Sequence, residues 1–170
     1  MRLYQKKIPV IAAEIVKRLT SEEDIETHSP AEVQLDLESV MNEYLRVERE
    51  ITDKAREHLK VTGLSFEHFG RVKRAKAEER DFALGEEGIR YMSGQMVEIL
   101  MQSNHVDEIY SSDAEIRAKI DAVLEKYMTL DEEIEEEVRK RLKNLEEGSS
   151  VWEIEYKKTL ARMKAKYQLE

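Results

Sequence analysis

Apolar side chains recur every three or four positions through residues 31–59, and this spacing predicts one long amphipathic helix. The apolar positions are Val33, Leu37, Val40, Tyr44, Val47, Ile51, Ala55 and Leu59. Such steps place one side chain per turn on a single face of an α-helix. A helix of about 30 residues extends for roughly 45 Å, so other helices must cover its apolar stripe.

The same pattern occurs a second time, 83 positions further along the chain. Its apolar positions are Ile116, Ile120, Val123, Tyr127, Leu130, Ile134, Val138 and Leu142. Tyr44 and Tyr127 hold the same place in the two stripes. We therefore expect both rings to be mostly buried at equivalent positions, with their hydroxyl groups bonded to polar partners at the rim of the core.

Both long stretches begin and end with similar residues. Ser29 and Ser112 are each followed three residues later by glutamate, as in a capping box, and they are the predicted N-caps. Gly63 and Gly148 follow the two stretches and are the predicted left-handed C-caps. These signals predict two uninterrupted helices of similar length.

Shorter helices are predicted on either side of each long one. Residues 9–19 and 93–102 form the first pair, and residues 67–82 and the segment after Ser149 form the second. The polar connectors between the short and long helices contain one isolated apolar residue each, Ile25 and Ile109, which we expect to plug the core.

The fold predicted from these elements is all-α. It is a tandem duplication of a three-helix unit (short, long and medium helix) packed into one helical bundle. The two units comprise residues 1–85 and 86–170, with a hinge at the glycine-rich segment 85–88. We expect the units to share one core, because a single unit of this size would leave much of its long stripe exposed.

Composition narrows the class of protein. Charged residues make up 38% of the chain, the formal net charge is −9, and there is no cysteine, which excludes disulfides and thiolate chemistry. No apolar run approaches the roughly 18 residues of a membrane span. We expect a cytoplasmic protein without a membrane partner, and one whose overall field repels nucleic acid.

Motifs of enzymes and cofactor-binding proteins are missing from the sequence. The four histidines match neither the Glu-x-x-His of di-iron bundles nor the His-Glu-x-x-His of zinc enzymes. The acidic runs at 131–133 and 135–137 flank Ile134 on a helix, where surface charge is the simpler interpretation. No catalytic, cofactor-binding or metal-binding residue is predicted, and we do not expect an enzyme.

The third helix of each unit is rich in basic residues. These form the candidate binding surface: Arg71, Lys73, Arg74 and Lys76 in the first unit, and Lys157, Lys158, Arg162 and Lys164 in the second. One interpretation is that they balance acidic helices within or between protomers. The other is a surface that faces the phosphates of RNA or DNA.

Several segments resemble one bacterial family. They are Met1-Arg2-Leu3-Tyr4 with Lys7-Ile8-Pro9, Glu43-Tyr44-Leu45, the Phe69, Val72 and Lys73 stretch, and Trp152 with Glu155-Tyr156 and Lys158-Thr159. The sequence resembles the family known as domain of unknown function 507 along essentially its whole length. The resemblance implies a cytoplasmic, helical bacterial protein and carries over no activity, cofactor or catalytic residue.

Two functions remain in view from the sequence. The first is a non-enzymatic interaction or scaffold protein that binds another cytoplasmic protein, or itself as a homo-oligomer. The alternative is a nucleic-acid- or ribosome-associated factor that uses the basic third helices.

Overall fold

The protein is helical almost throughout, which confirms the all-α fold class. The computed structural model describes residues 1–169. Its helices are α1 (Ile8–Ser21), α2 (Pro30–Thr62), α3 (Phe69–Glu79), α4 (Glu86–Gln102), α5 (Asp113–Met128), α6 (Leu130–Arg141) and α7 (Ser150–Lys166). Two short strands, β1 (Ile25–Thr27) and β2 (Val106–Ile109), and the 3₁₀ turns Gln5–Lys7 and Phe66–His68 complete it.

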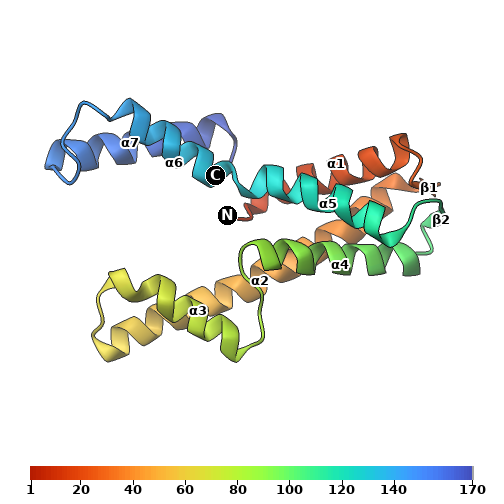
Figure 1. The fold of residues 1–170 in the computed structure, drawn as a ribbon, viewed down its shortest axis with the longest axis horizontal. Helices are drawn as coiled ribbons and strands as arrows, with labels where there is room; N and C mark the ends of the chain where they lie inside the picture. The colour runs from red at the N-terminus through yellow and green to blue at the C-terminus, as the bar shows by residue number, and fades with distance from the viewer. Residues whose placement is uncertain (170) are drawn as a thin grey trace.

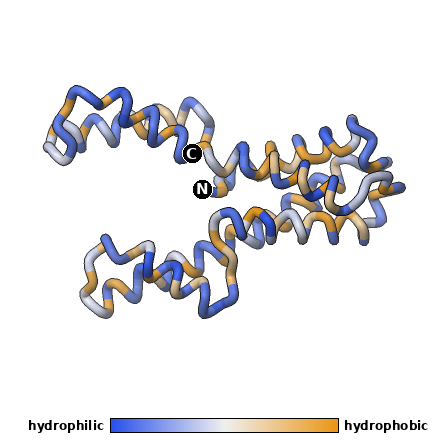
Figure 2. Tube along the Cα trace, viewed as in Figure 1, coloured by the Kyte–Doolittle hydropathy of each residue, from blue (hydrophilic) through white to orange (hydrophobic). Residues whose placement is uncertain are grey.

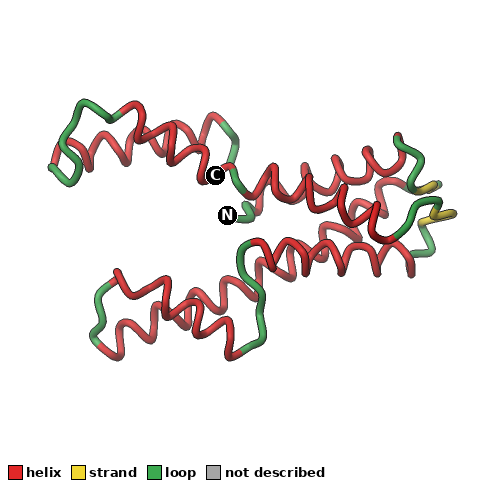
Figure 3. Tube along the Cα trace, viewed as in Figure 1, coloured by secondary structure: helices red, strands yellow, loops and turns green. Residues whose placement is uncertain are grey.

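The helices form a fork (Figure 1). A four-helix body contains α1, the N-terminal half of α2, α4 and α5. Two helical hairpins extend from the same end of this body: the first arm is the C-terminal part of α2 with α3, and the second arm is α6 with α7. Loops lie at the far ends of the arms, and the strands lie at the opposite end of the body (Figure 3).

Three apolar clusters stabilise the fork. Along each helix, hydrophobic positions alternate with hydrophilic ones (Figure 2). The largest cluster fills the body with side chains from both halves of the chain, including the fully buried Ile11, Leu37, Met92 and Met96. The second arm has its own cluster, as does the first. The halves therefore share a core, but the third helices lie outside it, on the arms.

The two connectors pair with each other as an antiparallel ribbon, which the sequence did not predict. Ile25 lies opposite Ile109 in its register, and these are the two isolated apolar residues of the connectors. Ile25 is buried, and Ile109 is partly buried against the body cluster. The expectation that they close the core is confirmed.

A buried aspartate fastens the ribbon to the body. Asp24 is only 2% exposed, and its carboxylate accepts hydrogen bonds from Ser111 and Lys119, both at 2.6 Å. Its backbone carbonyl also accepts the N–H of Tyr110 at 2.8 Å. Burial alone would raise the pKa of Asp24, but the bonds from Lys119 and Ser111 outweigh it and lower this pKa.

The second long helix is not continuous, and this part of the prediction was wrong. The chain turns at Thr129, between α5 and α6. The carbonyl of Met128 accepts the backbone N–H of Arg2 at 2.8 Å, although in an unbroken helix it would accept from Glu132. Glu132 donates to Thr129 instead, at 3.1 Å. The N-terminal segment therefore takes the bond that would have continued the helix.

The predicted helix ends are confirmed only in part. Gly63 is the left-handed C-cap of α2, with φ of 71°. Gly148 has φ of 86° but caps no helix, because α6 has already ended at Arg141. Ser112 accepts the N–H of Glu115 at 3.2 Å, as an N-cap should. Ser29 stands at the N-cap of α2 but makes no capping bond with its side chain.

The equivalent tyrosines behave as expected. Tyr44 is 3% exposed and donates its hydroxyl to the carbonyl of Ala83 at 2.9 Å. Tyr127 packs partly buried against the body cluster and donates to the carboxylate of Glu14. The first half runs α1, β1, α2, α3, whereas the second runs α4, β2, α5, α6, α7. The tandem duplication itself stays an interpretation of the sequence.

Candidate binding cleft between the two arms

A cleft of about 700 Å³ opens where the two arms leave the body. We call it the fork cleft. Residues 1–6 line it together with one face of α2 at positions 45–56, Phe69 and Lys73 of α3, and Asp131 and Leu169 from the second half. The N-terminus lies between the arms at this point, next to the end of α7 (Figure 1). The cleft thus collects residues from both ends and the middle of the chain.

The N-terminal segment that lines the cleft is firmly held. Leu3 is 2% exposed in the body cluster, and Tyr4 is buried in the cluster of the second arm. The Met1 ammonium group lies 2.7 Å from Glu132 and 3.5 Å from Asp131. Burial alone would lower the pKa of this amino group, but its hydrogen bond to Glu132 and the charges of both carboxylates raise it. This segment joins the body to the second arm.

Cationic side chains dominate the charge of the fork cleft. Within residues 1–169, five of them line it against three carboxylates: Arg2, Lys6, Arg49, Arg56 and Lys73 against Glu48, Asp53 and Asp131. Two of the carboxylates already have cationic partners, because Glu48 binds Lys73 at 3.2 Å and Asp131 faces the Met1 ammonium. The cleft is therefore locally basic on a chain whose net charge is −9.

The three arginines of the cleft contact uncharged groups. Arg49 donates to the side-chain oxygen of Gln5 at 2.7 Å. The guanidinium carbon of Arg2 lies 4.7 Å from the ring centre of Tyr4. That of Arg56 lies 6.0 Å from the ring centre of Phe69, within the range of a cation–π contact. None of the three forms an ion pair with a carboxylate in the described part of the chain.

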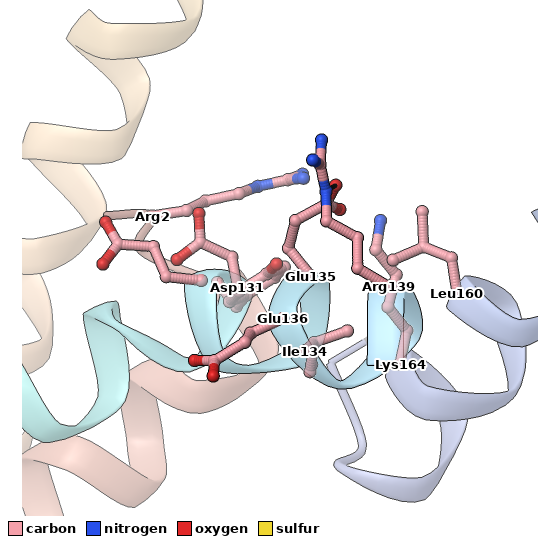
Figure 4. Close-up of a pocket in the computed structure, with 10 residues that line it drawn as sticks. Arg2, Asp131, Ile134, Glu135, Glu136, Arg139, Leu160 and Lys164 are labelled. Carbon is pink, nitrogen blue, oxygen red and sulfur yellow. Dashed lines mark hydrogen bonds and ion pairs between the residues drawn. The ribbon is translucent and has the colours of Figure 1, made fainter. Parts of the chain in front are cut away.

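A second cleft, of about 510 Å³, adjoins the first and shares Arg2, Tyr4 and Asp131 with it. We call it the α6–α7 cleft. Its wall on α6 is acidic, with Asp131, Glu132, Glu135 and Glu136. Arg2 extends toward Glu135 and Arg139 on this helix, whereas Leu160 and Lys164 come from α7 (Figure 4). Four carboxylates and three cations, Arg2, Arg139 and Lys164, line the α6–α7 cleft, so its charge is more acidic than that of the fork cleft.

Three acidic residues of α6, Glu135, Glu136 and Glu137, have partners on their own arm. Glu135 binds Arg139 at 3.1 Å, and its carboxylate also accepts the hydroxyl of Tyr156. Burial and this hydrogen bond raise the pKa of Tyr156 to about 12. Glu136 and Glu137 form i,i+4 pairs with Lys140 and Arg141. These contacts stabilise the arm and suit surface charge better than acid–base catalysis.

Comparison with known proteins places the chain in a family. The model of the family described as "Protein of unknown function (DUF507)" matches residues 1–169. The chain belongs to the DUF507 family. A search of the curated proteins found no match to it.

The basic residues predicted from the sequence lie on different arms of this DUF507 chain. Arg71, Lys73, Arg74 and Lys76 are on α3, and Lys157, Lys158, Arg162 and Lys164 are on α7. Lys73 pairs with Glu48 and Lys76 with Glu79, both at 3.2 Å, and Lys158 lies 3.8 Å from Glu155. The structure does not bring the two sets together.

Four of the eight predicted residues are exposed and make no ion pair within residues 1–169: Arg71, Arg74, Lys157 and Arg162. Two others line the clefts, Lys73 the fork cleft and Lys164 the α6–α7 cleft. The eight predicted residues therefore do not form one surface: some pair with carboxylates, some are exposed without such a partner, and some line a cleft.

Sequence reasoning missed the arginines of the fork cleft. Arg49 and Arg56 are seven positions apart on α2, two helical turns, and lie beside the apolar stripe of that helix. The sequence shows this spacing, but the spacing alone does not indicate a site. The site forms only because Arg2 and Gln5 fold against the same helix.

Within residues 1–169 of this DUF507 chain, no group of three histidine, aspartate or glutamate side chains is placed to bind a metal ion. Among the same residues, no helix combines the length and apolarity that crossing a membrane requires.

Proposed function

We propose that this chain is a non-enzymatic protein-binding or scaffold protein of the bacterial cytoplasm, which holds a segment of its partner between its two arms. The observation that supports this most is the fork cleft, a locally basic recess of about 700 Å³ on an otherwise acidic protein. Recesses at the junction of separately packed units are frequent binding sites.

The construction of the arms supports the same proposal. α3 packs chiefly on α2, and α7 chiefly on α6, each with its own apolar cluster. The walls of the fork cleft thus keep their shape without contacts between the arms. A recess whose walls are already formed binds a partner with less loss of conformational freedom.

Site-specific photo-crosslinking in cells would test this proposal. A photoreactive amino acid at Asp53, which is exposed and lines the fork cleft, should form an adduct with a discrete protein, and the adduct should survive nuclease. The same amino acid at Lys17, exposed on α1, is the matched control and should give no such adduct. An adduct with a second copy of the chain would identify the partner as the protein itself. Adducts with nucleic acid alone, or none from position 53, would contradict the proposal.

The second candidate function is binding of RNA or DNA by the third helices. Arg71, Arg74, Lys157 and Arg162 favour it, because they are exposed and have no carboxylate partner within residues 1–169. If this function holds, the logarithm of affinity should fall linearly with the logarithm of salt concentration. Reversal of Lys157, Lys158 and Arg162 to Glu should then abolish binding. We expect weak binding even at low salt, because the net charge of −9 repels a polyanion.

A further inference from the structure

We infer that the fork cleft recognises a carboxylate-bearing peptide segment of the partner, and that Arg2, Arg49 and Arg56 bind its acidic side chains. This inference rests on the proposed protein-binding function and adds the chemistry of the partner. It starts from the charge of the cleft. The carboxylates Glu48 and Asp131 already pair with cations, whereas none of the three arginines forms an ion pair with a carboxylate within residues 1–169.

The guanidinium groups are held in place by contacts that leave donors free. A ring beneath a guanidinium contacts its flat face, so the N–H groups at its edge stay available for a carboxylate. The guanidinium carbon of Arg2 lies 4.7 Å from the ring centre of Tyr4 and that of Arg56 lies 6.0 Å from the ring centre of Phe69, so both groups lie near a ring and form no ion pair within residues 1–169. Arg49 uses one of its N–H groups for Gln5 and keeps the others. Arginine forms paired, charge-assisted hydrogen bonds with carboxylates, which are about twice as strong as neutral ones.

The neighbouring α6–α7 cleft decides between a peptide and a nucleic acid. Its acidic wall on α6 begins at Asp131, which also lines the fork cleft. A nucleic-acid backbone carries a charge at every phosphate and would be repelled by this wall. A peptide can instead place acidic residues on the arginines and neutral or basic residues beside α6.

The spacing of the arginines sets the length of the segment. Arg49 and Arg56 lie seven residues apart on α2, a rise of roughly 10 Å along the helix axis. A peptide in the polyproline II conformation advances roughly 3.1 Å per residue with three residues per turn, so acidic residues three positions apart lie on one side, roughly 9 Å apart, and would reach both arginines. A short acidic segment is therefore sufficient.

Binding of a synthetic peptide to the full chain tests the inference. The probe is a fluorescent nine-residue peptide with Glu at every third position and Ser elsewhere, and its control replaces each Glu by Gln. Fluorescence anisotropy at low salt should show that the Glu peptide binds at least about tenfold more tightly. The double substitution R49Q/R56Q should lower the affinity for the Glu peptide at least about tenfold, because two charge-assisted contacts are lost. The matched substitution R71Q/R74Q removes two exposed arginines outside the cleft and should change affinity less than about twofold.

Thermal melting of each variant shows whether it keeps the fold. Equal binding of the two peptides, or of the Glu peptide by the parent and R49Q/R56Q, would overturn the inference. The inference would also be overturned if a single-stranded RNA 12-mer bound the parent more tightly than the Glu peptide does and the R49Q/R56Q substitution abolished this binding. That result would assign the cleft to nucleic acid. The two proposals can fail separately. If a photoreactive residue at position 53 forms the same protein adduct in R49Q/R56Q as in the parent, the protein-binding function stands and only the carboxylate chemistry is contradicted.

Discussion

The backbone N–H of Arg2 donates to the carbonyl of Met128 at 2.8 Å, and this bond lies at the bend between α5 and α6. At this point two stretches with nearly the same apolar pattern fold differently. α2 runs unbroken from Pro30 to Thr62. The equivalent stretch turns at Thr129, which gives the second arm its own direction.

Replacement of Arg2 by Pro should change the second arm. Proline has no N–H, so the Met128 carbonyl loses its donor. This carbonyl can then accept a hydrogen bond from the N–H of Glu132, as in a continuous helix. We expect a loss of stability of about 1 kcal/mol. We also expect a change in the distance between spin labels at Lys60 and Lys143, which the absence of native cysteine makes simple to attach. Arg2→Ala keeps the N–H, so it should preserve the label distance; equal distances in Arg2→Pro and the parent would contradict this role.

The sequence predicted the helices and the shared core because both follow from periodicity. The stripe from Val33 to Leu59 needed covering, and Ile25 and Ile109 had no other reason to be apolar. The bend at Thr129 could not be predicted, because the backbone group that bonds to the Met128 carbonyl there belongs to Arg2, more than a hundred residues away, and nothing in the local pattern interrupts the helix. The fork cleft was missed for the same reason: its charge arises from residues 1–6 meeting α2.

Gly88→Ala should destabilise the body. A Cβ at this position would lie 2.3 Å from the hydroxyl oxygen of Tyr44 and 3.0 Å from the carbonyl oxygen of Ala83. We expect a cost of about 1–3 kcal/mol, typical of overpacking, measured by chemical denaturation. Addition of Tyr44→Phe should recover part of this loss, since the hydroxyl is the closest atom. Gly70→Ala meets nothing within 4 Å and should be neutral or slightly stabilising; equal costs at the two glycines would refute the clash.

Asp24 should make stability depend on pH in the acid range. Its pKa is lower in the folded state than in the unfolded chain, where it is about 3.9. Its contribution is therefore complete at neutral pH and is lost as pH falls below about 4 through the folded value. Asp24→Asn should lower the melting temperature at pH 7, and the difference from the parent should shrink toward pH 3. A difference that stays constant across this range would show that Asp24 acts through packing alone.

The two predicted serine caps should now differ. Ser112→Ala removes the acceptor of the Glu115 N–H and should cost about 1 kcal/mol. Ser29→Ala should cost much less, because the Ser29 side chain makes no capping bond. Chemical denaturation of both variants checks this. A larger loss at Ser29 than at Ser112 would show that the helix starts are assigned wrongly.

The most direct test of partner binding in the fork cleft is an NMR titration of the full chain that monitors the arginine Nε–H groups. The probe is the nine-residue Glu peptide. We predict that the signals of Arg2, Arg49 and Arg56 shift as the peptide is added, because these guanidinium groups line the cleft and have no carboxylate partner within residues 1–169. The signals of Arg71, Arg74 and Arg162 should stay in place. Shifts confined to Arg71, Arg74 and Arg162 would contradict the account and move the binding surface to the third helices.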